Sequence, residues 1–329
     1  MQQDRPLIGI TLMMGFCIIA PVGDAVAKLL GASVPLGQVV LIRFAVQALI
    51  LIPIVWASGR AWRMSGRVFW LTLLRTILHM AGIAAMFTAL KYLPLADAVA
   101  IAFVMPFFML LLGKFILNEE VGPRRLGASI VGFLGTLLIV QPSFANVGWP
   151  ALLPIVVAVV FSFFMLVTRQ IAKQTDPISL QAVSGVMAVV MILPLLALGS
   201  AMPIAPLQII QPDALDWSLL LGIGLLGTIA HLLMTWSLRF APSTTLAPMQ
   251  YLEIPFATLL GLIIFSDLPN LLAGLGILIT VSAGLYIIMR ERATAHALAA
   301  AVVPPAAPQG SAAKSTAFPV RPSPARQAP

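Results

Sequence analysis

Long apolar stretches separated by short polar breaks fill the chain from residue 7 to residue 289. A helix of about 20 apolar residues crosses the hydrocarbon core of a bilayer, whereas the strands of a membrane barrel alternate in segments of about ten residues. The pattern therefore predicts an all-α integral membrane protein. We expect ten transmembrane helices, over residues 7–30, 36–57, 68–91, 95–116, 126–141, 148–171, 177–199, 216–238, 244–265 and 271–289.

Two parts of the chain repeat each other. ALKYLPLADAVAIAFVMPFFMLL, from Ala89, aligns with SLRFAPSTTLAPMQYLEIPFATLL, from Ser237, with one inserted residue, and Pro106 then meets Pro255. Each copy has five expected spans, so the second copy enters the bilayer from the opposite side. This favours two inverted repeats over two proteins fused end to end.

The repeat predicts three regions. Residues 1–142 form a first five-helix repeat and residues 143–292 a second one. Residues 293–329 consist mainly of Ala, Pro, Ser and Gln, a composition that buries little apolar surface. We expect this last region to be a disordered cytoplasmic tail.

Pro106 and Pro255 lie near the middle of the fourth helix of their repeats. A proline inside a helix removes a backbone hydrogen bond, and paired helix interruptions in inverted repeats indicate a binding site at the bilayer midplane. The alternative is a kink without function, because proline is common in membrane helices.

Composition and charge agree with a membrane protein. The chain is 60% hydrophobic and 9% charged, with a net charge of +8 and a mean hydropathy of +1.03. Only Lys28 and Lys91 lie in outward connections, whereas twelve of the other basic residues of residues 5–292 lie at inward loops and ends, and Arg43 and Arg75 lie within spans. The positive-inside rule therefore predicts a multi-pass protein of the cell inner (plasma) membrane with both termini in the cytoplasm. The charge reflects topology and gives no reason to expect nucleic acid as a partner.

Several kinds of chemistry have no support in the sequence. Cys17 is alone, the three histidines are widely spaced, and the ATP-binding pattern GxxxxGK[ST] is missing. We expect no metal, no cofactor, no catalytic residues and no enzymatic activity. A membrane-embedded lipid-modifying enzyme is a remote alternative, because such enzymes need clustered acids and the 11 acids here are scattered.

The duplicated ALKYLPLADAVAIAFVMPFF stretch, the LNEEVGPRRLG junction with a glycine-rich helix after it, and Arg43 carry a family resemblance. Through the order and spacing of these motifs, the chain resembles the ten-helix, EamA-type transporters of the drug/metabolite transporter superfamily over residues 7–289. The second copy departs from the pattern, because SDLPNLLAG replaces the acidic junction. The resemblance implies a secondary transporter of a small metabolite that works by alternating access.

Charged groups at the centre of a membrane helix cost about 2.5–3.5 kcal/mol and need a partner, water or a function. Glu253 lies near the middle of its span and shares a helix face with Gln250. It is either a substrate contact or proton carrier, or a structural ion-pair partner of Arg43 or a histidine. Arg43 could equally snorkel outward, and snorkelling accounts for Arg75, which lies near the inner edge of the third span.

His79 and His231 lie in the third span of their repeats, near the middle of the bilayer. There they could bind a ligand or only hydrogen-bond a neighbouring helix. His231 belongs to a polar stripe with Thr235, next to Trp236. Asp24 and Lys28, four residues apart, read as a local structural pair. The candidates for substrate binding or coupling are Glu253, Gln250, His231, Trp236, Thr235, His79 and Arg43.

The expected substrate is a neutral or weakly cationic solute with a flat ring. It would stack on Trp236, Tyr251, Phe107 and Phe256. Within the resemblance, this favours uptake of a heterocyclic metabolite such as riboflavin or S-adenosylmethionine, with an amino-acid or drug exporter as the alternative. The sequence leaves open whether transport is coupled to protons, and it is compatible with a homodimer.

Overall fold

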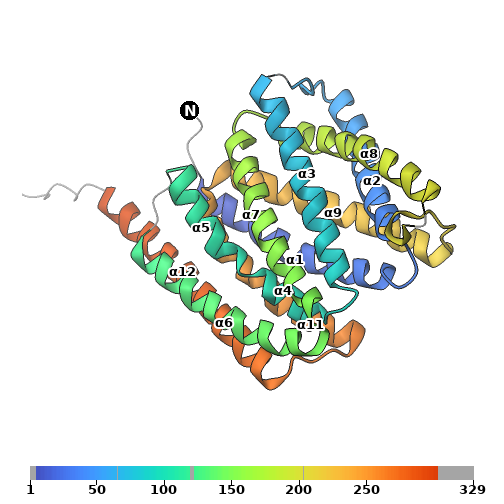
Figure 1. The fold of residues 1–329 in the computed structure, drawn as a ribbon. Coiled ribbons are helices and arrows are strands. Elements are labelled where there is room, and N and C mark those ends of the chain that lie inside the picture. The colour runs from blue at the N-terminus through green and yellow to red at the C-terminus, as the bar shows by residue number, and fades with distance from the viewer. Residues whose placement is uncertain (1–4, 65, 119–121, 203, 303–329) are drawn as a thin grey trace, which may run out of the picture. The chain divides into compact units, whose positions relative to one another are not determined.

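The computed structural model describes residues 5–64, 66–118, 122–202 and 204–302. Contacts divide the chain into two compact units, Met1–Glu291 and Arg292–Pro329. The described residues are helical and contain no strand, which agrees with the predicted all-α class (Figure 1). The helices are α1 (Pro6–Leu30), α2 (Leu36–Ala57), α3 (Gly66–Ala89), α4 (Leu95–Ala102), α5 (Met105–Ile116), α6 (Pro123–Val147), η1 (Trp149–Leu152), α7 (Leu153–Ala172), α8 (Pro177–Ala201), η2 (Ala205–Leu207), α9 (Ala214–Phe240), α10 (Ser243–Leu246), η3 (Ala247–Leu252), α11 (Glu253–Phe265) and α12 (Leu271–Val302).

Helix length and composition identify 8 segments of the described chain that could cross a membrane. They coincide with the first eight expected spans, and the fourth combines α4 with α5. Two shorter apolar segments, Met249–Phe265 and Leu271–Tyr286, occupy the positions of the last two.

Both copies of the repeat have an interrupted fourth helix. In the first copy, α4 ends at Ala102 and α5 begins at Met105, one residue before Pro106. In the second copy, the 3-10 helix η3 leads into α11, which begins at Glu253, two residues before Pro255. Proline is tolerated in the first turn of a helix because the N–H groups there have no intrahelical partner. Each proline therefore lies in the first turn of the helix that follows the interruption.

Helices of the two repeats pack on one another rather than forming separate bundles. Within the first unit, α1 packs along α9, α3 along α7, and α2 along α8. The interrupted helices also meet, because α11 contacts α4 and α1 (Figure 1).

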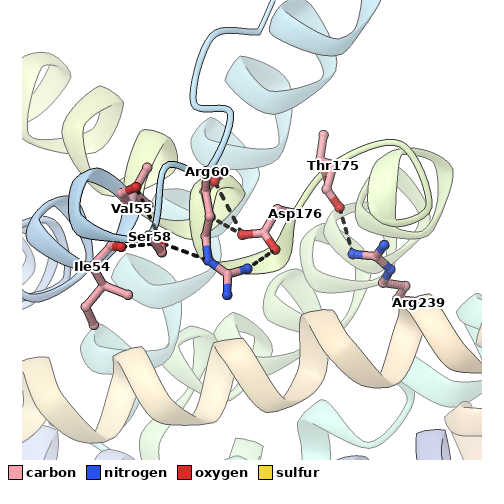
Figure 2. Close-up of polar contacts among 8 residues, drawn as sticks. Ile54, Val55, Ser58, Arg60, Thr175, Asp176 and Arg239 are labelled. Carbon is pink, nitrogen blue, oxygen red and sulfur yellow. Dashed lines mark hydrogen bonds and ion pairs between the residues drawn. The ribbon is translucent and has the colours of Figure 1, made fainter.

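Polar contacts tie together the helix ends that carry the arginines of the predicted cytoplasmic loops (Figure 2). Arg60, after α2, donates from Nη1 to Asp176 Oδ1 at 2.5 Å, where Asp176 caps α8. Arg239, near the end of α9, donates from Nη1 to the carbonyl oxygen of Thr175 at 3.3 Å. The helix ends on this side are therefore joined by side-chain contacts.

The predicted disordered tail needs a correction over its first residues. α12 continues to Val302, so residues 293–302 are helical. The alanines of this segment have the highest helix propensity of any residue type, and the interpretation from composition gave this too little weight. Residues 303–329 and the junction residues 119–121 lie outside the described residues.

Candidate functional site

A cavity of about 120 Å³ lies between α1, α2, α3, α4, α7 and α9. Asp24, Arg43 and His231 are the ionisable residues in its wall. Most of the remaining wall is apolar, with four phenylalanines, Phe16, Phe87, Phe103 and Phe161. A mostly apolar lining with a few convergent polar groups is typical of a small-molecule site, whereas the volume is below the roughly 300–1,000 Å³ of such sites.

Arg43 lies in the cavity wall and is not a snorkelling residue. It is only 4% exposed, and its Nη1 has no hydrogen-bond partner among the described residues. Gly227 of α9 provides the space for the guanidinium, because a Cβ at Gly227 would lie 2.8 Å from Arg43 Nε. The guanidinium also lies over the ring of Phe44, with Cζ 4.9 Å from the ring centroid.

Asp24 was predicted to pair with Lys28, and this prediction is wrong. Lys28 Nζ instead donates to Asp267 Oδ2 at 2.9 Å and to the Leu93 carbonyl oxygen at 3.1 Å. Asp24 faces the cavity from α1. The signal that singled out Glu253, an acid within an apolar helix, applied to Asp24 as well, but the i,i+4 lysine obscured it.

His79 and His231 meet at the side of the cavity. Their Nε2 atoms are 3.0 Å apart, and the contact joins α3 to α9 across the two repeats. One ring must donate and the other accept. The ring of Phe164 lies against His79, with centroids 4.7 Å apart. The structure thus brings together two predicted candidates, of which His231 lines the cavity.

Arg75 also differs from the prediction, because it is fully buried and does not snorkel. Its guanidinium donates to neutral oxygens on three helices: Thr168 Oγ1 at 2.9 Å, Ser184 Oγ at 2.9 Å, Gln181 Oε1 at 3.1 Å and Thr235 Oγ1 at 3.4 Å. The i,i+4 position of His79 gave no hint of these partners, because they come from α7, α8 and α9. These five residues are called the Arg75 cluster below.

Glu253 is the first residue of α11, at the helix interruption, where the positive end of a helix favours a carboxylate. It is 8% exposed, and its Oε1 has no hydrogen-bond partner among the described residues. Neither Arg43 nor a histidine forms an ion pair with it in the described part of the chain. Gln250, one turn earlier, is fully buried and donates from Nε2 to the sulfur of Met165 at 3.1 Å. Neither residue belongs to the wall of the cavity defined above.

The aromatic residues expected around the substrate lie elsewhere. Trp236 is half-buried and outside the wall of this cavity, as are Phe107 and Phe256. Tyr251 packs between α6 and α12, because a Cβ at Gly132 or Gly284 would overlap its ring or hydroxyl. Sequence periodicity gives the helix face on which an aromatic ring lies, but it does not specify which neighbouring helix that ring contacts.

The cavity lies in the half of the bundle away from the arginine-bearing helix ends. Asp24 is close to the last residue of α1, Leu30, and Arg43 is close to the first residue of α2, Leu36. The Arg75 cluster draws on the opposite halves of α3, α7, α8 and α9. Four features therefore follow one another along the bundle. They are the cavity, the His79–His231 pair, the Arg75 cluster and the helix ends joined by the Arg60 and Arg239 contacts.

No group of three or more His, Cys, Asp or Glu residues in the described ranges could hold a metal ion.

Residues 7–141 and residues 148–290 each match the family model described as the EamA-like transporter family. The chain belongs to the EamA-like transporter family. As a member, it is a multi-pass membrane protein, and neither the family description nor the relatives' names indicate an enzyme.

The relatives of this EamA-like transporter are named for different solutes. The chain is 28% identical over 256 residues to a riboflavin transporter of Brucella anthropi, covering 77% of this chain and 88% of the relative. It is 24% identical to an S-adenosylmethionine uptake transporter of Rickettsia felis, covering 87% and 94%. It is 26% identical to the pseudopaline exporter CntI of Pseudomonas aeruginosa, covering 79% and 88%.

A solved protein structure matches the fold of this transporter. The TM-score is 0.63 with 17% identity, over 88% of this chain and 98% of the other. This similarity concerns the fold alone.

Proposed function

We propose that this EamA-like transporter is a secondary transporter of the cell inner membrane that takes up a small heterocyclic metabolite by alternating access. The observation that carries the proposal is the cavity lined by Asp24, Arg43, His231 and four phenylalanines. Relatives named for riboflavin and S-adenosylmethionine support a ring-bearing solute. The exporter among the relatives makes export of an amino acid or drug the alternative.

Ten membrane crossings in two inverted five-helix repeats form part of the proposal. The family model matches the chain twice. The contacts are also paired as a two-fold axis requires: α1 with α9 corresponds to α7 with α3, and α1 with α11 corresponds to α7 with α5. In this arrangement α11 and α12 cross the bilayer as the ninth and tenth spans, and both termini lie in the cytoplasm.

The proposal of alternating access rests on the order in which the cavity, the Arg75 cluster and the arginine-bearing helix ends follow one another along the bundle. With the arginine-bearing ends in the cytoplasm, the cavity faces the outer side and the Arg75 cluster lies beneath it. The Arg60–Asp176 and Arg239–Thr175 contacts close the cytoplasmic end (Figure 2). We propose that this is the outward-facing state and that these inner contacts separate when the transporter opens inward.

Glu253 is the proposed coupling residue. A carboxyl group at the break between η3 and α11, with an oxygen that lacks a partner in the described chain, can gain and lose a proton as the helices move. Proton coupling, exchange and facilitated diffusion make different predictions for this one residue. Only proton coupling requires that Glu253 titrate.

The proposal is tested with purified protein in proteoliposomes. Uptake of labelled riboflavin, S-adenosylmethionine and amino acids is measured with and without an imposed pH gradient. We expect saturable uptake of at least one ring-bearing solute, and loss of the gradient's effect in Glu253→Gln. The matched control is Asp97→Asn, because Asp97 is a buried acid of α4 that lies outside the cavity wall and accepts a hydrogen bond from Ser143 of α6. Wild-type protein that moves no solute of the panel would refute transport, and an unchanged response to pH in Glu253→Gln would remove Glu253 from coupling.

A further inference from the structure

We propose that Asp24 and Arg43 together recognise a zwitterion, so that the substrate is a flat-ringed solute with an amino-acid end, bearing both an ammonium and a carboxylate. This inference rests on the proposed function and narrows its substrate class. It favours a solute of the amino-acid or S-adenosylmethionine type over riboflavin, which has no ammonium.

The first step concerns Arg43. A guanidinium has five N–H donors in a planar fork that matches a carboxylate. In this protein the fork is buried, faces the cavity, and leaves Nη1 without a partner among the described residues. A buried charged donor without a partner is costly. A ligand carboxylate would remove this cost by a charge-assisted, bidentate contact.

The second step concerns Asp24. It shares the cavity wall with Arg43, yet the two form no ion pair within 4.0 Å, and Asp24 has no ion-pair or hydrogen-bond partner in the described part of the chain. Its expected partner Lys28 is held by Asp267. The half-buried Asp24 is close enough to Arg43 for their charges to attract but lies more than 4.0 Å from the guanidinium. The cavity therefore offers an acceptor for an ammonium group that is not in direct contact with the guanidinium.

The third step concerns the ring. Phe16, Phe87, Phe103 and Phe161 supply aromatic surface in the same cavity. Aromatic faces pack favourably with flat rings. A zwitterion with a ring would thus contact the two charged groups at one end and the phenylalanines at the other.

Opposite charges in one wall also explain why simpler ligands would bind less tightly. An amine without a carboxylate leaves Arg43 unpaired, and a carboxylate without an amine leaves Asp24 unpaired. A neutral ring leaves both groups unpaired. Sites built to pair with polar groups discriminate strongly against analogues that lack them, because the buried partner then stays unsatisfied.

The test uses ligands that share an indole ring and differ in which of these charged groups they carry. Tryptophan carries both groups, tryptamine only the ammonium, indole-3-propionate only the carboxylate, and 3-methylindole neither. Binding to the full-length protein in lipid nanodiscs is measured by calorimetry, with S-adenosylmethionine and riboflavin for comparison. We expect tryptophan or S-adenosylmethionine to bind at least tenfold more tightly than the singly charged and neutral analogues.

Two variants assign the roles. In Asp24→Asn, tryptophan should lose its advantage over indole-3-propionate but keep its advantage over tryptamine. In Arg43→Gln the opposite loss is expected. Asp24→Glu and Arg43→Lys should partly restore the ranking, and the control Asp97→Asn should leave it unchanged. A variant that misfolds would lose all ligands, and Asp24→Glu and Arg43→Lys then carry the test. A folded Asp24→Asn or Arg43→Gln variant that weakens tryptamine and indole-3-propionate to the same extent would overturn the assignment.

The remaining outcomes separate the two proposals. If the wild type takes up riboflavin in proteoliposomes but binds no zwitterion more tightly than its singly charged analogues, the zwitterion inference is overturned and the transport function stands. If the wild type neither binds nor transports any member of the panel, the proposed function is overturned and the inference falls with it.

Discussion

Gly227→Ala should weaken substrate binding without unfolding the protein, because Gly227 provides the space for the Arg43 guanidinium. The added Cβ would lie 2.8 Å from Arg43 Nε and 2.9 Å from Cζ and Nη2. Carbon and nitrogen atoms pack at about 3.5 Å or more, so the guanidinium must retreat by roughly 0.7 Å. The moving group is the end of a flexible side chain, so the helices can stay in place.

The expected size of the effect follows from the contact that is disturbed. A hydrogen bond to a charged group contributes about 1.5–3 kcal/mol, and losing about half of one such contact raises the Michaelis constant roughly three- to tenfold. The assay is substrate uptake into proteoliposomes at varied concentration. Gly222→Ala in the same helix is the matched control, because a Cβ there meets nothing within 4 Å. Equal Michaelis constants for the two variants would refute the role given to the Arg43 position.

Two further predictions concern stability and are read from thermal unfolding in detergent. Ser184→Ala removes a buried hydrogen bond that Arg75 donates and should lower the free energy of unfolding by about 1.5–3 kcal/mol. Ser129→Ala is the control and should not lower it, because the buried Oγ of Ser129 has no partner among the described residues. Equal melting temperatures of the two variants would contradict this. Gly276→Ala would place a Cβ 2.5 Å from the Gly135 carbonyl oxygen and should cost about 1–3 kcal/mol through overpacking of α6 on α12. Gly274→Ala in the same helix meets nothing within 4 Å and should instead gain about 1 kcal/mol of helix propensity; a Gly276→Ala variant as stable as Gly274→Ala would show that these helices pack less closely.

Much of the fold could be predicted because membrane insertion imposes a simple pattern. Apolar runs of sufficient length must be helices in lipid, and the predicted runs coincide with the helices from α1 to α12. The helix interruptions were also predictable, because Pro106 and Pro255 occupy matching places in a visible repeat. The end of α12 was not, because an alanine-rich segment can be a helix or a tail depending on its surroundings.

The polar interior was harder to predict, because its contacts join residues far apart in the chain. Arg75 depends on Gln181 and Ser184, more than one hundred positions away, so its local position near a helix end wrongly favoured snorkelling. Asp24 was assigned to Lys28 by spacing alone, although Lys28 reaches Asp267. Helical periodicity identifies residues that share a face, but the neighbour of that face is set by tertiary packing.

The account depends most on the claim that the cavity beside Asp24 and Arg43 is a substrate chamber open to the outer side. The direct measurement is the labelling of Ala20→Cys, a cavity position, by a membrane-impermeant thiol reagent in cells whose transporter carries Cys17→Ala. Leu225→Cys, whose native side chain on α9 is 48% exposed and outside the cavity wall, is the lipid-facing control. We predict that position 20 is labelled from outside and that a transported substrate slows the labelling, while position 225 is not labelled. Failure to label position 20 from outside, or labelling that no transported substrate slows, would contradict the claim.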